Sequence, residues 1–311
     1  MAQPATPGCI KGCIIVPIIT ILVLVIVVVG GAFIVLNMTP ADLGIADVEL
    51  FEGETFETLG LANVKFKEIP NFIKDLTNVD ESKIVTNTYT EEDKTSANDN
   101  ISGSNIKKKE DNTIDYSSIA TDKIIYPTKQ NVEYNDTTLA YIFNQMLADG
   151  AESSDDAVEF LKELNANINE VTIAPSENGY SLRIVASISL QSITGEVKAA
   201  LKEAGIDGLI SLPEKVFLVS YSDMEINAEG TLVTTSKSLK INDSDNPISQ
   251  AIMKVLAKKA NETAQEEGQQ VDTSSNTVND EIGKAFVSIV SNLGKPIELK
   301  EGAIVVETYT E

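Results

Sequence analysis

The sequence predicts an α+β protein, in which an antiparallel sheet carries amphipathic helices on one face and is preceded by one N-terminal transmembrane helix. Three observations support this fold class. Residues 14–36 contain no charged side chain. Several later segments repeat apolar residues at spacings of three and four, the pattern of a helix with one buried face. Other segments alternate apolar and polar residues around turn-forming pairs, which is typical of antiparallel strands.

The predicted transmembrane helix has the sequence IIVPIITILVLVIVVVGGAFIVL. About 20 apolar residues in a helix span the roughly 30 Å hydrocarbon core of a bilayer. Lys11 precedes the helix, whereas Asp42 and five further acidic residues follow it before the first cation, Lys65. Since positive charge is retained in the cytoplasm, we expect a single-pass plasma-membrane protein with its N-terminus inside and its C-terminal domain outside. The lipid bilayer is then a partner through residues 14–36, and a cleaved signal peptide is the main alternative.

Composition divides the rest of the chain. Residues 1–13 form a short cytoplasmic tail, and residues 37–78 form a juxtamembrane stalk. Residues 79–118 are rich in Asp, Glu, Lys, Asn, Ser and Thr, with scattered apolar residues only. Such a segment buries too little apolar surface to offset the entropy of ordering, so it is predicted to be a disordered acidic and polar linker. Residues 119–311 form the extracytoplasmic α+β domain.

Helices are predicted by their caps and stripes. Asp136 begins one that ends near Gly150, and Asp155 begins a second. A short helix is expected at residues 196–204. Asn246, followed by proline, is a good cap for the next helix. The last helix starts at Val278 and ends at Gly294, a residue common just after a helix.

Strands are predicted by alternation and by their turns. Asn178-Gly179 lies between two alternating runs, the common signature of a tight hairpin. Three extended stretches follow Pro213, with the sequences VFLVSY, MEINAE and TLVTT, and they predict a meander. The chain closes with a hairpin that turns at Glu301-Gly302.

Missing residue types exclude several function classes. The chain has no histidine, so catalysis and metal binding by imidazole are excluded. Both cysteines, Cys9 and Cys13, precede the hydrophobic segment, and Arg183 is the only arginine. The net charge of −23 opposes nucleic-acid binding, which needs clustered cations. We expect no enzyme activity, no catalytic or metal site, no cofactor and no nucleic-acid partner. Asp243, Asp245 and Asn246 lack the glycine and the final glutamate of a calcium loop and predict a turn with a helix cap.

The apolar stripes of the last two predicted helices are the candidate ligand site. They are either ordinary core or the lining of a cleft for an acyl chain, because a chain with 5% aromatic residues packs aliphatic side chains that can border a tunnel. The candidate lining residues are Ile248, Ile252, Leu256, Ile282, Phe286 and Ile289.

A family resemblance adds to this interpretation. The order helix, hairpin and short helix, the run LPEKVFLVSYSDMEINAEG at 212–230 and the closing helix before IELKEGAIVV resemble the YpmS-type single-anchor envelope proteins of Gram-positive bacteria. The resemblance covers residues 130–308 and implies a tubular lipid-binding-like fold. It carries no functional residue over.

The function predicted from the sequence is therefore that of a non-enzymatic, membrane-anchored, extracytoplasmic protein whose ligand is lipid or another cell-envelope component, such as an envelope protein. Two alternatives stay open. One is an adhesion or assembly module that binds a protein partner or a glycan. The other is a carboxylate-based hydrolase, which needs two carboxylates at a separation of roughly 5 to 10 Å.

Overall fold

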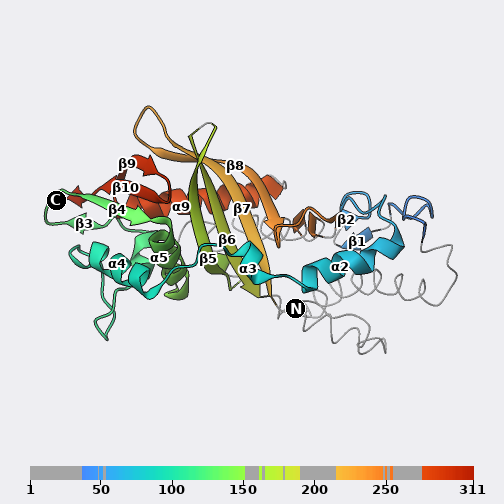
Figure 1. Ribbon diagram of the computed structural model, residues 1–311, viewed down its shortest axis with the longest axis horizontal. Coiled ribbons are helices and arrows are strands. Elements are labelled where there is room, and N and C mark those ends of the chain that lie inside the picture. Colours follow the sequence, from blue (N-terminus) through green and yellow to red (C-terminus); the bar gives the residue numbers. More distant parts are fainter. Residues whose placement is uncertain are drawn as a thin grey trace, which may run out of the picture. The chain divides into compact units, whose positions relative to one another are not determined.

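The computed structural model describes residues 37–47, 49–51, 54–150, 161–162, 165–177, 179–189, 215–247, 249–250, 253–254 and 275–311. The predicted transmembrane helix and the helix expected at 196–204 lie outside these ranges. Of the helix expected from Asp155, only residues 161–162 are described, and both are helical. Within them, no helix combines the length and the apolar character that crossing a bilayer requires. The described part is α+β with antiparallel sheets, which confirms the predicted class at this level (Figure 1).

The chain divides into two compact units. Unit 1 comprises Met1–Val79, Leu190–Val216 and Ser244–Leu256, and unit 2 comprises Asp80–Ser189, Phe217–Asp243 and Ala257–Glu311. Unit 2 is therefore assembled from three separate stretches of the sequence.

Unit 1 contains a small hairpin and a helix where the sequence predicted a stalk. Strands β1 (Glu49–Phe51) and β2 (Glu54–Thr55) are antiparallel. The short helix η2 (Phe66–Glu68) leads into α2 (Ile69–Thr77), which has proline in its first turn, where the missing N–H is tolerated. The buried apolar side chains include Phe56, Leu59, Leu61, Val64 and Leu76.

The predicted cap at Asn246 is confirmed. Its side-chain oxygen accepts a hydrogen bond of 2.8 Å from the backbone N–H of Ser249, as an N-cap does.

Unit 2 contains a three-stranded sheet with the order β4-β10-β9, made of β4 (Asn131–Asn135), β10 (Ala303–Glu307) and β9 (Lys295–Lys300). Both pairings are antiparallel. The predicted terminal hairpin is confirmed, and Gly302 supplies the positive φ of +72° in its turn. Beside this sheet, β3 (Ile125–Tyr126) pairs in parallel with β11 (Tyr309–Thr310).

The larger sheet of unit 2 has the order β5-β6-β7-β8. Its strands are β5 (Asn167–Ser176), β6 (Gly179–Ser189), β7 (Lys215–Ile226) and β8 (Leu232–Ile241). Ser176 pairs with Gly179, which confirms the predicted hairpin. The stretch VFLVSY and the first half of MEINAE, Met224–Ile226, belong to one strand, β7, so the prediction of two separate strands is wrong. The pairing of β7 with β8 shifts register between Tyr221 and Ser222, but the chain does not turn there; it turns at residues 227–230.

Two predicted helices of unit 2 are confirmed. Helix α5 (Asp136–Ala148) packs against β5, and α9 (Ser275–Leu293) packs against β8. Figure 1 shows α9 running across the four-stranded sheet. Gly283 permits this close approach, because a Cβ at that position would lie only 2.6 Å from Oγ1 of Thr234.

The prediction of a disordered linker at 79–118 is wrong. Helices α3 (Glu81–Ile84) and α4 (Glu91–Ser102) and the short helix η3 (Tyr116–Ala120) form there, and α4 packs against α5. Thr90 and Asp93 form a reciprocal capping box that starts α4. Most of the few apolar side chains of the segment are buried, among them Ala97, Ile101, Ile106, Ile114 and Tyr116. The globular unit therefore starts at Asp80 and not at residue 119.

Candidate functional site

The most distinctive polar cluster in the described part of the chain surrounds an ion pair between Glu170 and Arg183. Glu170 lies on β5, directly after an irregularity in the pairing with β6, and Arg183 lies on β6. The side chain of Glu170 is completely buried, whereas that of Arg183 keeps 17% of its surface exposed. Nη1 of Arg183 donates to Oε1 of Glu170. A buried charge needs such compensation, because its transfer from water costs several kcal/mol.

Glu170 accepts further hydrogen bonds from residues on two sides. The hydroxyl of Thr172, on the same strand, donates to Oε1 at 2.8 Å. The backbone N–H groups of Thr86 and Asn87 donate to Oε2 at 2.5 and 3.0 Å. Burial alone would raise the pKa of Glu170, but these hydrogen bonds and the charge of Arg183 together hold it below its usual value. The carboxylate is therefore ionised near neutral pH, and both of its oxygens accept hydrogen bonds.

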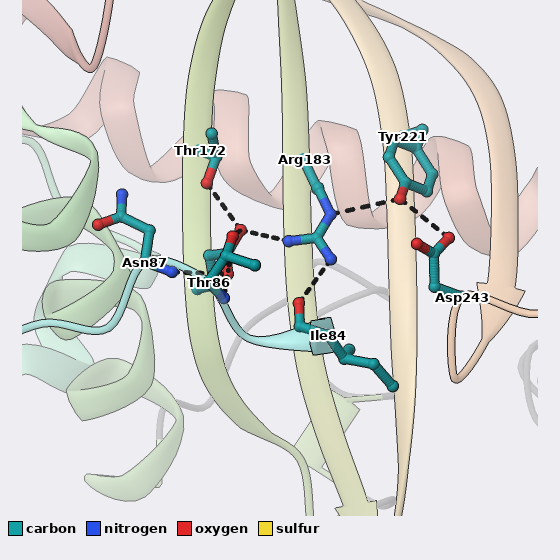
Figure 2. Close-up of polar contacts among 8 residues, drawn as sticks. Ile84, Thr86, Asn87, Thr172, Arg183, Tyr221 and Asp243 are labelled. Atoms are coloured by element: carbon teal, nitrogen blue, oxygen red, sulfur yellow. Dashed lines mark hydrogen bonds and ion pairs between the residues drawn. The ribbon is translucent and has the colours of Figure 1, made fainter. Parts of the chain in front are cut away.

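Arg183 extends the cluster towards β7 and towards the C-terminal end of α3 (Figure 2). Its Nη2 donates to the backbone carbonyl of Ile84 at 2.6 Å, and its Nε donates to the hydroxyl of Tyr221 at 3.3 Å. The Tyr221 hydroxyl in turn donates to Oδ1 of Asp243 at 2.9 Å. Burial and the neighbouring Asp243 raise the pKa of Tyr221, although Arg183 opposes this. One chain of hydrogen bonds thus runs from Glu170 to Asp243.

This cluster and helix α9 lie on opposite faces of the sheet. Neighbouring residues of a strand point to opposite faces, and Ser220 and Tyr221 are neighbours on β7. The Ser220 hydroxyl donates to Oδ1 of Asn279, on α9, at 2.5 Å, whereas Tyr221 reaches Arg183. Figure 2 shows the same arrangement, with α9 behind the strands and the Ile84–Asn87 segment in front of them. Helix α9 therefore lies on one face of the sheet, and residues 84–87 lie on the other.

Unit 2 has a second buried carboxylate. Asp136, the first residue of α5, is 8% exposed and accepts a 2.8 Å hydrogen bond from the N–H of Thr137. Burial raises the pKa of Asp136, and the charge of Glu170 adds to the rise.

The chemistry of this arrangement favours structural support over catalysis. Glu170 has no exposed surface, and both of its oxygens already accept hydrogen bonds from neighbouring groups. A general base must reach the proton that it removes, and Glu170 could do so only after the surrounding segment had moved. Among the described residues, no three His, Cys, Asp or Glu side chains lie close enough together to hold a metal ion.

The structure places half of the predicted ligand-lining residues. Ile282, Phe286 and Ile289 are buried on α9, with 2%, 1% and 2% of their surface exposed, and α9 packs on β8. Ile248, Ile252 and Leu256 are not among the residues whose side chains are described.

The sequence analysis did not single out the cluster around Arg183. One signal was available, because Arg183 is the only arginine of the chain and interrupts an apolar alternating strand. The partners at 84–87 are about 84 residues away from Glu170, and no local pattern points to them. Comparison with protein-family models, curated proteins and solved structures gives no match.

Proposed function

We propose that the chain is a non-enzymatic, single-pass membrane-anchored protein that displays its acidic α+β units outside the cell, where they bind lipid or another envelope component. The observation that carries this proposal is the uncharged segment at 14–36, with Lys11 before it and only acidic charges directly after it. The hydropathy of this segment supports the anchor, and the charge asymmetry supports the orientation.

The buried cluster supports the non-enzymatic part of the proposal. The only arginine of the chain is used to neutralise Glu170 and to hold the carbonyl of Ile84. Arginine is the side chain best suited to grip a phosphate or carboxylate substrate in two places, and here its donors face the protein itself. Because no arginine is left to hold a charged substrate, the proposed ligand is bound by apolar surface or by hydrogen bonds from the main chain.

The apolar stripe on α9 is buried against the sheet, as expected of core residues. A lipid would have to occupy space that opens beside this helix, whereas a protein or glycan partner would use the outer surface. Lipid binding therefore requires α9 to move away from the sheet, whereas partner binding leaves α9 in place.

Fractionation tests the anchor. The full chain, expressed in bacterial cells, should stay with the membrane after a high-salt or alkaline wash. A variant with Leu24→Arg and Val27→Arg should be released, because each charge costs about 3 kcal/mol at the centre of a membrane helix. Protease added to intact cells should remove the folded units and leave a small N-terminal fragment. Recovery of the unaltered chain in the soluble fraction would refute the anchor, and protection of the whole chain from protease would reverse the orientation.

An acyl-chain probe tests the lipid ligand. The detergent-purified full chain should take up a fluorescent fatty acid. If Phe286 borders the acyl-chain site, Phe286→Asp should abolish the uptake while the fold is retained. Ile297→Asp is the matched control, because Ile297 is 41% exposed on β9. If the unaltered chain takes up no probe and Phe286→Asp unfolds unit 2, the α9 stripe is core, and the ligand is a protein or glycan instead.

A further inference from the structure

The last turns of helix α9 are fixed by hydrogen bonds to segments outside the four-stranded sheet. The side-chain amide of Asn292 donates to the carbonyl of Ile119 at 2.8 Å, and the carbonyl of Asn292 accepts from the N–H of Ile124 at 2.8 Å. The hydroxyl of Tyr309, on β11, donates to the carbonyl of Ser291 at 2.9 Å. The C-terminal end of α9 is therefore attached at several points of the surrounding fold.

The second half of α9 also buries the larger share of the helix's apolar side chains. Its members with 2% or less of their surface exposed are Phe286, Ile289, Val290 and Leu293. Before Gly283, the buried apolar side chains among the described residues are Val278 and Ile282. Lifting a helix from a sheet exposes its apolar surface to water, so the second half of α9 is the harder one to lift.

The first half of α9 lies over hydroxyl-bearing residues of β7 and β8. We call Ser220, Ser222 and Thr234 the hydroxyl patch. The hydroxyl of Ser220 donates to Oδ1 of Asn279 at 2.5 Å, and Nδ2 of Asn279 donates to the carbonyl of Tyr221 at 3.0 Å. Two polar contacts of Asn279 thus attach this half to the sheet.

Ser222 contributes a hydroxyl that gains nothing from the docked helix. The residue is 1% exposed, and in the described part of the chain its Oγ finds no hydrogen-bond partner. A Cβ at Gly283 would lie 3.9 Å from this Oγ, which places the hydroxyl directly beneath α9. A buried hydroxyl without a partner costs free energy, because it has given up its hydrogen bonds with water. Lifting the first half of α9 removes this cost.

We propose that residues 275–283 are a lid over the hydroxyl patch, which lifts while residues 284–293 stay docked, and that an acyl chain enters beneath it. When the lid lifts, water replaces the hydrogen bonds of Asn279, so their loss costs little. The acyl chain then covers the apolar surface from which Val278 and Ile282 withdraw. The choice of an acyl chain rests on the proposed function, whereas the lid itself does not.

Thiol labelling tests the lid without any ligand. The detergent-purified full chain carries Cys9→Ser and Cys13→Ser, so that one introduced thiol is followed at a time. Ser222→Cys places this thiol under the lid, and Val306→Cys is the matched control at a completely buried site against Gly294, the residue after α9. In the native protein, a maleimide should label position 222 on the order of tenfold faster than position 306, because local opening requires less free energy than global unfolding. In urea the two positions should react alike.

Asn279→Ala shows whether the polar contacts hold the lid. It should speed the labelling of position 222 further and leave position 306 unchanged. Equal labelling of the two positions in the native protein would overturn the lid, because both would then open only when unit 2 unfolds. Unchanged labelling of position 222 in Asn279→Ala would overturn it as well.

A disulfide across the lid tests the entry of the ligand. A Cβ at Gly283 would lie 3.3 Å from Cβ of Thr234, close to the roughly 3.5–4.5 Å that separates these atoms in disulfides. Gly283→Cys combined with Thr234→Cys, in the chain without its own cysteines, should therefore close the lid on oxidation. The oxidised protein should take up no fluorescent fatty acid, and reduction should restore the uptake.

Equal uptake by the oxidised and reduced protein would overturn entry beneath the lid. If neither the reduced protein nor the unaltered chain takes up the probe, while position 222 is still labelled faster than position 306, the lid stands and the acyl-chain ligand of the proposed function is refuted.

Discussion

Arg183 and Glu170 form an ion pair in which the carboxylate is completely shielded from solvent while the guanidinium keeps 17% of its surface exposed. The pair joins two neighbouring strands, and its other hydrogen bonds are made with Thr172, with Tyr221 and with the strap of residues 84–87. A change at either residue therefore affects the sheet and the strap together.

Arg183→Met should destabilise unit 2 by about 3–5 kcal/mol, because it leaves the buried charge of Glu170 without a partner. Urea denaturation followed by circular dichroism measures the loss. Lys300→Met is the matched control. It breaks the exposed pair with Glu133, and exposed pairs contribute about 0–1 kcal/mol. A loss for Arg183→Met no larger than that of the control would mean that Glu170 takes up a proton or water instead.

The acid limb of the stability profile should depend on Glu170. Its pKa is lowered in the folded state, so its contribution is complete above the ordinary value of 4.5 and is lost as the pH falls through the lowered value. Glu170→Gln should therefore be less stable than the unaltered chain at pH 7, and this difference should shrink in strong acid. Denaturation midpoints at a series of pH values check this, and a difference that stays constant down to about pH 2 would contradict it.

Gly283→Ala should loosen the docking of α9. The new Cβ would lie 2.6 Å from Oγ1 and 3.3 Å from Cβ of Thr234, so the helix or the strand has to move. Overpacking of this kind costs about 1–3 kcal/mol. Gly103→Ala is the control, because a Cβ there meets nothing within 4 Å and the glycine has no positive φ. If Thr234→Ala in the same chain fails to restore stability, the cost does not come from this contact.

Trypsin should cut native protein at Lys107–Lys109, where all three side chains are exposed in a short loop. The two fragments should nevertheless elute together from a sizing column, because Ile106 and Ile114, on either side of the loop, are buried in unit 2. Separation of the fragments without denaturant would instead support a disordered linker before residue 119. Intact mass and gel filtration distinguish these outcomes.

The elements that the sequence predicted correctly are those whose signals are local. Helix α5 begins directly after Asn135 with Asp136 in its first turn, and α9 carries a continuous apolar stripe. Each hairpin has glycine at its turn, at Gly179 and Gly302. Caps, stripes and turns act within a few residues, so they can be recognised without knowledge of the fold.

The error at 79–118 shows where this reasoning fails. The segment contains few apolar residues, and composition alone therefore predicted disorder. Ile101 and Tyr116 are nonetheless buried, because α5 offers a surface for them that local sequence does not describe. The capping box of Thr90 and Asp93 was the one local sign that a helix starts there.

The sequence by itself determined the α+β class of the described residues, the positions of α5 and α9, the two glycine turns and the absence of histidine chemistry, because each depends on composition or on neighbours in the chain. Only the tertiary structure decided the role of Arg183. Its carboxylate partner lies on the adjacent strand, and the strap lies about 84 residues before that partner in the sequence. Such contacts depend on strand register and on the route of the chain across the sheet, and these are set when distant segments pack together.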